Sequence, residues 1–190
     1  MNAAEHIVES YFRLCCGCFT FSDRKVDGGN NRQLDILAYD LKEKRQFHIE
    51  VGVTHRPTWY PSREELAVHF EKKFFGAPPE RRSSTGNRTD FEKHKSYFPQ
   101  IEKAYLEVGF SPADVKRVWV CWKLKDEDTK SFVWRFDSKH LKKTFEIQVL
   151  SLRDCILPDL KEATGTANYD DEVLRTLGFI KQWEIQTAGG

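Results

Sequence analysis

The chain has 190 residues, with 30 Lys or Arg against 29 Asp or Glu, so its formal net charge is only +1. This near balance excludes a uniformly basic nucleic-acid-binding surface, although it leaves room for a local one. The length suits a single domain with a substantial core. No apolar run approaches about eighteen residues and no signal-peptide pattern is present, so we expect a soluble cytoplasmic protein without a membrane partner.

The first third of the chain shows one helical and three strand-like patterns. Apolar residues recur at helical spacing over 3–14, and Gly17 follows as the expected helix end. Turn-forming residues over 27–31 then separate the first two of three β-type segments, which we place at 18–26, 33–39 and 47–54.

The rest of the chain predicts alternating helices and strands. Ser62 is placed to cap a helix over 63–75 that ends at Gly76. The turn-rich, basic stretch 77–89 reads as a loop, and Pro99 is expected to bend a helix over 90–108. Further elements are expected as strands over 115–124, 131–136 and 146–152 and a helix over 170–184.

Two acidic residues stand inside the apolar strand patterns, Asp35 in the second strand and Glu50 in the third. Burying an unpaired carboxylate costs several kcal/mol, so a partner or a metal ion is expected beside each. If residues 41–44 form the loop of a hairpin, Asp35 and Glu50 lie directly opposite each other on one face of the sheet. A divalent cation would relieve the repulsion between them.

The five cysteines form no evident disulfide framework, because the count is odd and no signal peptide precedes them. Cys15 and Cys18 have the C-x-x-C spacing of zinc and redox sites, but no second pair of ligands appears. Small buried residues at a helix-to-strand junction are the simpler interpretation, and a thiol-based redox or zinc protein is the alternative.

The element order α-β-β-β-α-β, with Asp35 and Glu50 in the second and third strands, resembles the restriction-endonuclease-like, or PD-(D/E)xK, nuclease superfamily. The resemblance covers about residues 1–125 of a single domain, 1–190, and leaves about 126–190 as a C-terminal extension. It implies an α/β fold with a mixed sheet flanked by helices. The segment 49–54 is similar to the third strand of archaeal Holliday-junction resolvases, except that Gly52 stands where they have lysine.

The resemblance implies that Asp35, Glu50 and the main-chain carbonyl of Val51 hold Mg²⁺, for which Mn²⁺ can substitute. Many members add a glutamate from the first helix, and Glu5 lies nearer the apolar stripe than Glu9 does. An ordinary solvated helix face explains both glutamates equally well.

Some relatives carry the missing lysine on the following helix. Lys73 borders the apolar stripe of that helix here, whereas Lys72 points away, so Lys73 is the candidate replacement. A basic side chain that extends from a half-buried helix to solvent is the alternative. His48 shares the face of Glu50 and is a candidate base, phosphate contact or satisfied strand residue.

Contacts to a phosphate backbone are expected from arginines that follow the third strand or lie in the basic loop: Arg56, Arg81, Arg82 and Arg88. Trp59 and Tyr60 are placed either to stack on a base or to close an edge of the core. Trp119, Trp122 and Trp134 lie in strand patterns and are expected mostly in the core.

Two functions from different classes follow. The first is a Mg²⁺-dependent nuclease that hydrolyses phosphodiester bonds, in DNA rather than RNA, with a homodimer favoured if the substrate is two-fold symmetric. The second is a degenerate nuclease fold that serves as a nucleic-acid-binding or protein-interaction module, with Gly52 marking the loss of catalysis.

Overall fold

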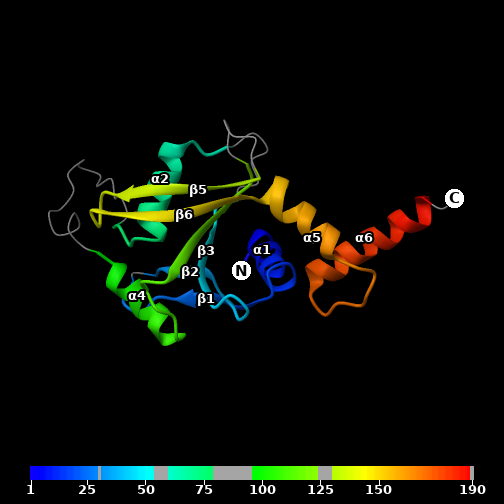
Figure 1. Cartoon of the computed structure of the whole chain (residues 1–190), viewed down its shortest axis with the longest axis horizontal. Helices are drawn as coiled ribbons and strands as arrows, with labels where there is room; N and C mark the ends of the chain where they lie inside the picture. The colour runs from blue at the N-terminus through cyan, green and yellow to red at the C-terminus, as the bar shows by residue number, and fades with distance from the viewer. Residues whose placement is uncertain (30, 54–59, 79–95, 124–129, 189–190) are drawn as a thin grey trace.

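The protein is α/β, with one mixed six-stranded sheet flanked by helices (Figure 1). The computed structural model describes residues 1–29, 31–53, 60–78, 96–123 and 130–188. The strands are β1 (Cys18–Lys25), β2 (Gln33–Asp40), β3 (Arg45–Val51), β4 (Val115–Cys121), β5 (Ser131–Ser138) and β6 (Lys143–Ser151). The helices are α1 (Ala3–Leu14), α2 (Arg63–Lys73), α4 (Phe98–Glu107), the π-helical turn η1 (Leu152–Ile156), α5 (Leu157–Ala163) and α6 (Glu172–Ala188).

The strands lie in the order β1-β2-β3-β4-β6-β5. β1, β2 and β3 form an antiparallel meander, β3 to β4 and β4 to β6 are parallel, and β5 returns antiparallel to β6. The long connection that contains α2 and α4 joins the parallel pair β3 and β4, as parallel strands require. β5 and β6 therefore continue the sheet, although they lie in the part of the sequence expected as an extension.

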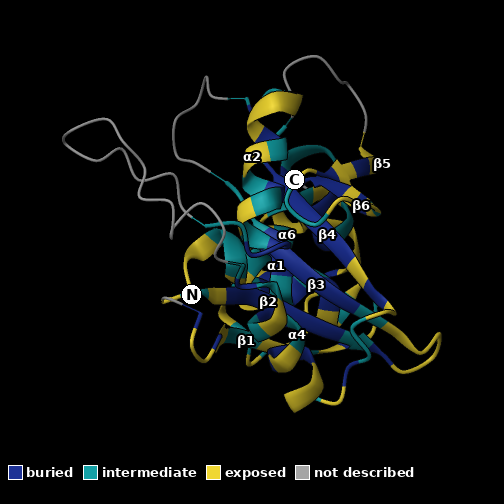
Figure 2. Ribbon diagram, turned by 90° about the vertical axis from the view of Figure 1, so that its left-hand side faces the viewer, coloured by how far each residue is buried: buried dark blue, intermediate teal, exposed yellow. Residues whose placement is uncertain are grey.

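Helices pack on both faces of the sheet. Ile36 and Ile49 point towards α1, where they join Val8 and Phe12 in one core. Because side chains alternate along a strand, Leu37 points the other way and packs among core residues of α4. Leu66 and Phe70 of α2 pack on the same second face, against Trp119, Ile147 and Val149. Figure 2 shows the central strands β2, β3 and β4 as the most continuously buried part of the fold.

Several predicted elements have different ends in the structure. The expected bend at Pro99 was wrong: α4 begins at Phe98, and Pro99 lies in its first turn. A proline is tolerated there because the first amides of a helix have no intrahelical acceptor. β4 ends at Cys121 rather than at residue 124, and α6 continues to Ala188 rather than ending at 184.

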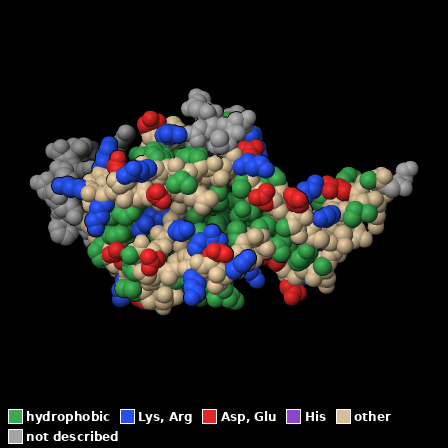
Figure 3. Space-filling view, viewed as in Figure 1, with side chains coloured by type: hydrophobic (Ala, Val, Ile, Leu, Met, Phe, Trp, Pro, Cys, Tyr) green, Lys and Arg blue, Asp and Glu red, His purple; other side chains and the backbone are tan. Residues whose placement is uncertain are grey.

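Charges on the surface are mixed. On the face seen in Figure 3, basic and acidic side chains are interspersed, in keeping with the formal net charge of +1. Within the described ranges, no helix has both the length and the apolar character needed to span a bilayer.

Candidate functional site

Asp35 and Glu50 meet because of the hairpin between β2 and β3. Asp40 pairs with Arg45 and Ile36 with Ile49, so the next pair along the same register is Asp35 and Glu50. The turn is stabilised by Asp40, which accepts hydrogen bonds from the Lys42 and Glu43 amides at 3.0 and 3.1 Å. The predicted four-residue loop and the shared face of the two acids are thus confirmed.

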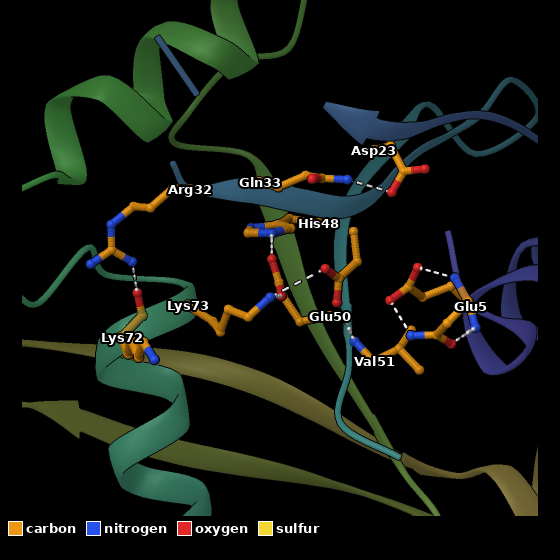
Figure 4. A network of polar contacts seen from close by, with 11 residues as sticks. Glu5, Asp23, Arg32, Gln33, His48, Glu50, Val51, Lys72 and Lys73 are labelled. Carbon is orange, nitrogen blue, oxygen red and sulfur yellow. Dashed lines mark hydrogen bonds and ion pairs between the residues drawn. The ribbon is translucent and has the colours of Figure 1, made fainter. Parts of the chain in front are cut away.

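Lys73 lies against both carboxylates. Its Nζ is 3.2 Å from Asp35 Oδ1 and 2.5 Å from Glu50 Oε2. Figure 4 shows the lysine reaching from the end of α2 to Glu50 on β3. The contact with Oε2 is a charge-assisted ion pair, and a carboxylate oxygen has a second lone pair that this contact does not use. Of the two lysines at the end of α2, Lys73 lies against the carboxylates, whereas Lys72 is exposed.

The helix that carries Lys73 is held at both ends. Ser62 caps its start, because the Glu65 amide donates to the Ser62 hydroxyl and the Ser62 amide donates to the Glu65 carboxylate at 2.8 Å. At its other end, Arg32 donates hydrogen bonds to the carbonyl oxygens of Lys72 and Ala77. These contacts fix where α2 ends and therefore where Lys73 begins its reach towards the sheet.

The absence of a lysine at position 52 has a steric cause. A Cβ atom on Gly52 would lie 2.1 Å from Cζ2 and 2.8 Å from Cε2 of Trp119. The indole of Trp119 is 3% exposed and packs against His69 and Phe70. Any side chain at position 52 would therefore collide with a ring that cannot move aside easily.

Glu50 has a second set of partners beneath it. His48 Nε2 lies 2.8 Å from Glu50 Oε1, and His48 Nδ1 lies 2.7 Å from the hydroxyl of Tyr105 in α4. Burial, together with the nearby Arg117 guanidinium, lowers the pKa of His48 to about 3, so its ring is neutral at physiological pH. Of the three roles considered for His48, this environment matches the satisfied strand residue.

Burial dominates the electrostatics of the acidic pair. Desolvation and the neighbouring Glu50 raise the pKa of Asp35 to about 6, although Lys73 and the Val51 amide oppose the shift. Burial also raises the pKa of Glu50, again against Lys73. The two carboxylates raise the pKa of Lys73 in turn, despite its own desolvation, so the lysine is a cation.

The chemistry of the donor set suits a hard divalent cation. The two carboxylates offer oxygen ligands of the kind that Mg²⁺ prefers. The Val51 amide donates a hydrogen bond to Asp35 Oδ2 at 2.9 Å, which holds Asp35 beside the residue whose carbonyl is the third predicted ligand. However, the described part of the chain contains no group of three or more His, Cys, Asp or Glu side chains arranged to hold a metal ion. Cys15 and Cys18 are free thiols and form no such group either.

Asp35 lines a pocket of about 610 Å³, whereas Glu50 is fully buried behind it. Its wall includes Asp35 and Lys73 together with Arg32, Lys72, Asp23 and Glu5. In Figure 4, Arg32 and Lys72 lie on the α2 side of Glu50, whereas Asp23 and Glu5 lie on the opposite side. The pocket therefore has a basic wall and an acidic wall, with Asp35 between them.

Glu5 lines this pocket but is engaged elsewhere. Its carboxylate accepts from the backbone amide and the side-chain amide of Asn2, at 2.8 and 2.5 Å, as part of the cap of α1. Glu9 instead accepts from the hydroxyls of Thr20 and Ser22 on β1. Glu5 is thus the glutamate nearer the site, as its position on the helix predicted.

The candidate phosphate contacts Arg56, Arg81, Arg82 and Arg88 lie outside the described residues, as does Trp59. Tyr60 is half-buried. Trp119 is buried in the core, and Trp122 and Trp134 are partly buried against it, which agrees with the prediction for the three strand tryptophans.

Sequence reasoning missed Tyr105 and Trp119 as parts of the site. Tyr105 is fully buried in α4, and its apolar spacing gives no sign that its hydroxyl would reach His48 on another element. For Trp119 a signal was present, because a glycine at position 52 in an apolar strand often marks a close approach by another group.

Comparisons with known proteins identify no relative: no protein-family model, no curated protein and no solved structure matches the chain.

Proposed function

We propose that the protein is a Mg²⁺-dependent nuclease that hydrolyses phosphodiester bonds, in DNA rather than RNA. The observation that carries the proposal is the arrangement of Lys73 within 3.2 Å of Asp35 and 2.5 Å of Glu50, beside a pocket with a basic wall. The α-β-β-β-α-β order with β3 and β4 parallel adds support, since it is the order expected for the PD-(D/E)xK superfamily.

In this proposal, Asp35, Glu50 and the Val51 carbonyl hold Mg²⁺. When bound, the ion would supply an activated water and offset charge on the phosphate. Lys73 acts as the missing motif lysine, since an ammonium donates hydrogen bonds to a water or to a phosphate oxygen as negative charge develops. Its position on α2 compensates for Gly52, where Trp119 leaves no room for a side chain.

One observation favours the alternative of a degenerate nuclease fold that binds nucleic acid or protein. Lys73 already supplies a positive charge to both carboxylates, so their repulsion is relieved without a metal ion. The two functions differ in whether a divalent cation binds to Asp35 and whether DNA is then cut.

The deciding experiment is calorimetric titration of Mn²⁺ into the wild-type protein, Asp35→Asn and Asp23→Asn. Mn²⁺ occupies the oxygen sites that suit Mg²⁺. Asp23 lines the same pocket, but its contacts are with Gln33 and the N-terminal ammonium, so it serves as the control. We expect binding to the wild type and to Asp23→Asn, and its loss in a folded Asp35→Asn.

Cleavage of branched, duplex and single-stranded DNA in Mg²⁺ then tests catalysis. We expect cleavage by the wild type, its loss on chelation with EDTA, and its loss in Lys73→Met with Mn²⁺ binding retained. Equal Mn²⁺ titrations of the wild type and Asp35→Asn would refute the metal site and favour the binding module.

A further inference from the structure

A chain of three polar side chains runs through the core beneath the carboxylate pair. It consists of Tyr105 on α4, His48 on β3 and Glu50 on β3, all three with 0% relative exposure. The links are 2.7 Å from the Tyr105 hydroxyl to His48 Nδ1 and 2.8 Å from His48 Nε2 to Glu50 Oε1. Buried polar groups are costly unless every one of them is paired, so the presence of this hydrogen-bonded series in the core calls for a functional explanation.

The proton positions along the chain follow from the charge on Glu50. The Lys73 ammonium lies 2.5 Å from Glu50 Oε2, which favours the ionised carboxylate, and an ionised carboxylate only accepts hydrogen bonds. When Glu50 is ionised, His48 Nε2 carries the proton that is donated to Oε1. Nδ1 is then a lone pair, and it accepts the hydroxyl proton of Tyr105.

Packing holds the imidazole in this orientation. The His48 ring meets Phe74 of the α2 C-cap nearly edge-on, with centroids 4.9 Å apart and planes at 83°. It also meets the Tyr105 ring at 5.6 Å and 66°. Because Phe74 directly follows Lys73, the ring contacts both the segment that supplies the lysine and the helix that supplies the tyrosine.

We propose that His48 is a positioning residue for Glu50, with its Nε2–H tautomer favoured jointly by the Glu50 carboxylate at Nε2 and by the Tyr105 hydroxyl at Nδ1. The hydrogen bond to Oε1 leaves Oε2 directed at Lys73 and available for a metal ion. The inference rests on the proposed function, because the purpose it gives to His48 is to orient a metal ligand. Groups that orient metal ligands in this way affect affinity through geometry, without touching the ion themselves.

Two independent measurements test the proposal. The first is long-range ¹H–¹⁵N NMR of the imidazole in the wild-type protein and in Tyr105→Phe, a change that removes one hydroxyl and preserves the ring. We expect a neutral ring protonated at Nε2 in the wild type. Tyr105→Phe removes the hydroxyl that donates to Nδ1. The ring in this variant should therefore be a mixture of the Nε2–H and Nδ1–H tautomers. A wild-type ring protonated at Nδ1 would overturn the proposed direction of donation.

The second measurement is Mn²⁺ affinity by calorimetry for the wild type, Tyr105→Phe, His48→Leu and His48→Gln, with the fold checked by circular dichroism. Glutamine keeps an N–H donor near the position of Nε2, whereas leucine fills space without donating. We expect affinity about 10- to 100-fold weaker in His48→Leu, by analogy with other groups that orient ligands, and substantial recovery in His48→Gln.

The outcomes distinguish failure of the positioning role of His48 from failure of the proposed metal site. Tight binding by the wild type with unchanged affinity in both Tyr105→Phe and a folded His48→Leu would refute the positioning role and leave the metal site intact. No binding by the wild type would refute the metal site itself, and with it the purpose given to His48. Should His48→Leu fail to fold, the Mn²⁺ affinity of Tyr105→Phe still tests the positioning role, and an unchanged affinity would refute it.

Discussion

Replacing Gly52 by alanine should destabilise the protein strongly for so small a change. The added Cβ would lie 2.1 Å from Cζ2 of Trp119, far inside the 3.0 Å that Cβ contacts essentially never cross. Cζ2 belongs to a rigid ring, and His69, Phe70 and Phe74 pack around that ring, so relief requires movement of the indole or of β3 itself. Overpacking of a tight core costs about 1–3 kcal/mol, and we expect about 3 kcal/mol here.

A double-mutant cycle identifies the cause. Trp119→Phe removes part of the indole that blocks position 52, so Gly52→Ala should cost less than about 1 kcal/mol in that background. The coupling free energy would then be about 2 kcal/mol, within the range for residues in contact. Urea denaturation of the four proteins measures it. A single-mutant cost below about 0.5 kcal/mol, or strictly additive effects, would refute the argument that Trp119 excludes a side chain here.

Three further predictions concern α2 and the acidic pair. Lys73→Met should lower the free energy of unfolding by about 3 kcal/mol at pH 7, because it leaves Asp35 and Glu50 without their cation. Lys72→Met, at an exposed position, should change it by less than about 0.5 kcal/mol. Equal effects of the two substitutions in urea denaturation would contradict a stabilising ion pair at Lys73. The pKa of Asp35 is raised from 3.8 to about 6, so the folded state binds more protons than the unfolded state between these values. The wild type should therefore lose about 2 kcal/mol of stability relative to Asp35→Asn as the pH rises from 4 to 6, and less than about 0.5 kcal/mol above that. A difference independent of pH in a denaturation series would show that Asp35 is not perturbed. Ser62→Ala should cost about 1 kcal/mol by removing the cap of α2, which thermal unfolding would detect as a lowered Tm; an unchanged Tm would mean that the cap contributes nothing to stability.

Local patterns in the sequence were sufficient for most of the fold. The apolar spacing over 3–14 predicted α1 with both its ends, and Ser62 with Gly76 bracketed α2. Pro99 was misread as a bend, because proline suits the first turn of a helix as well as a break inside one. The place of β6 between β4 and β5 could not be predicted, since strand order depends on contacts between segments far apart in the chain.

The sequence by itself determined that Asp35 and Glu50 would face each other, because strand alternation and a four-residue turn set the register of one hairpin. Only the tertiary structure decided what surrounds them. Lys73 reaches the pair from α2, Tyr105 reaches His48 from α4, and Trp119 fills the space above Gly52. Each of these contacts joins elements that are distant in sequence, so it depends on how helices pack on the sheet and not on any local pattern.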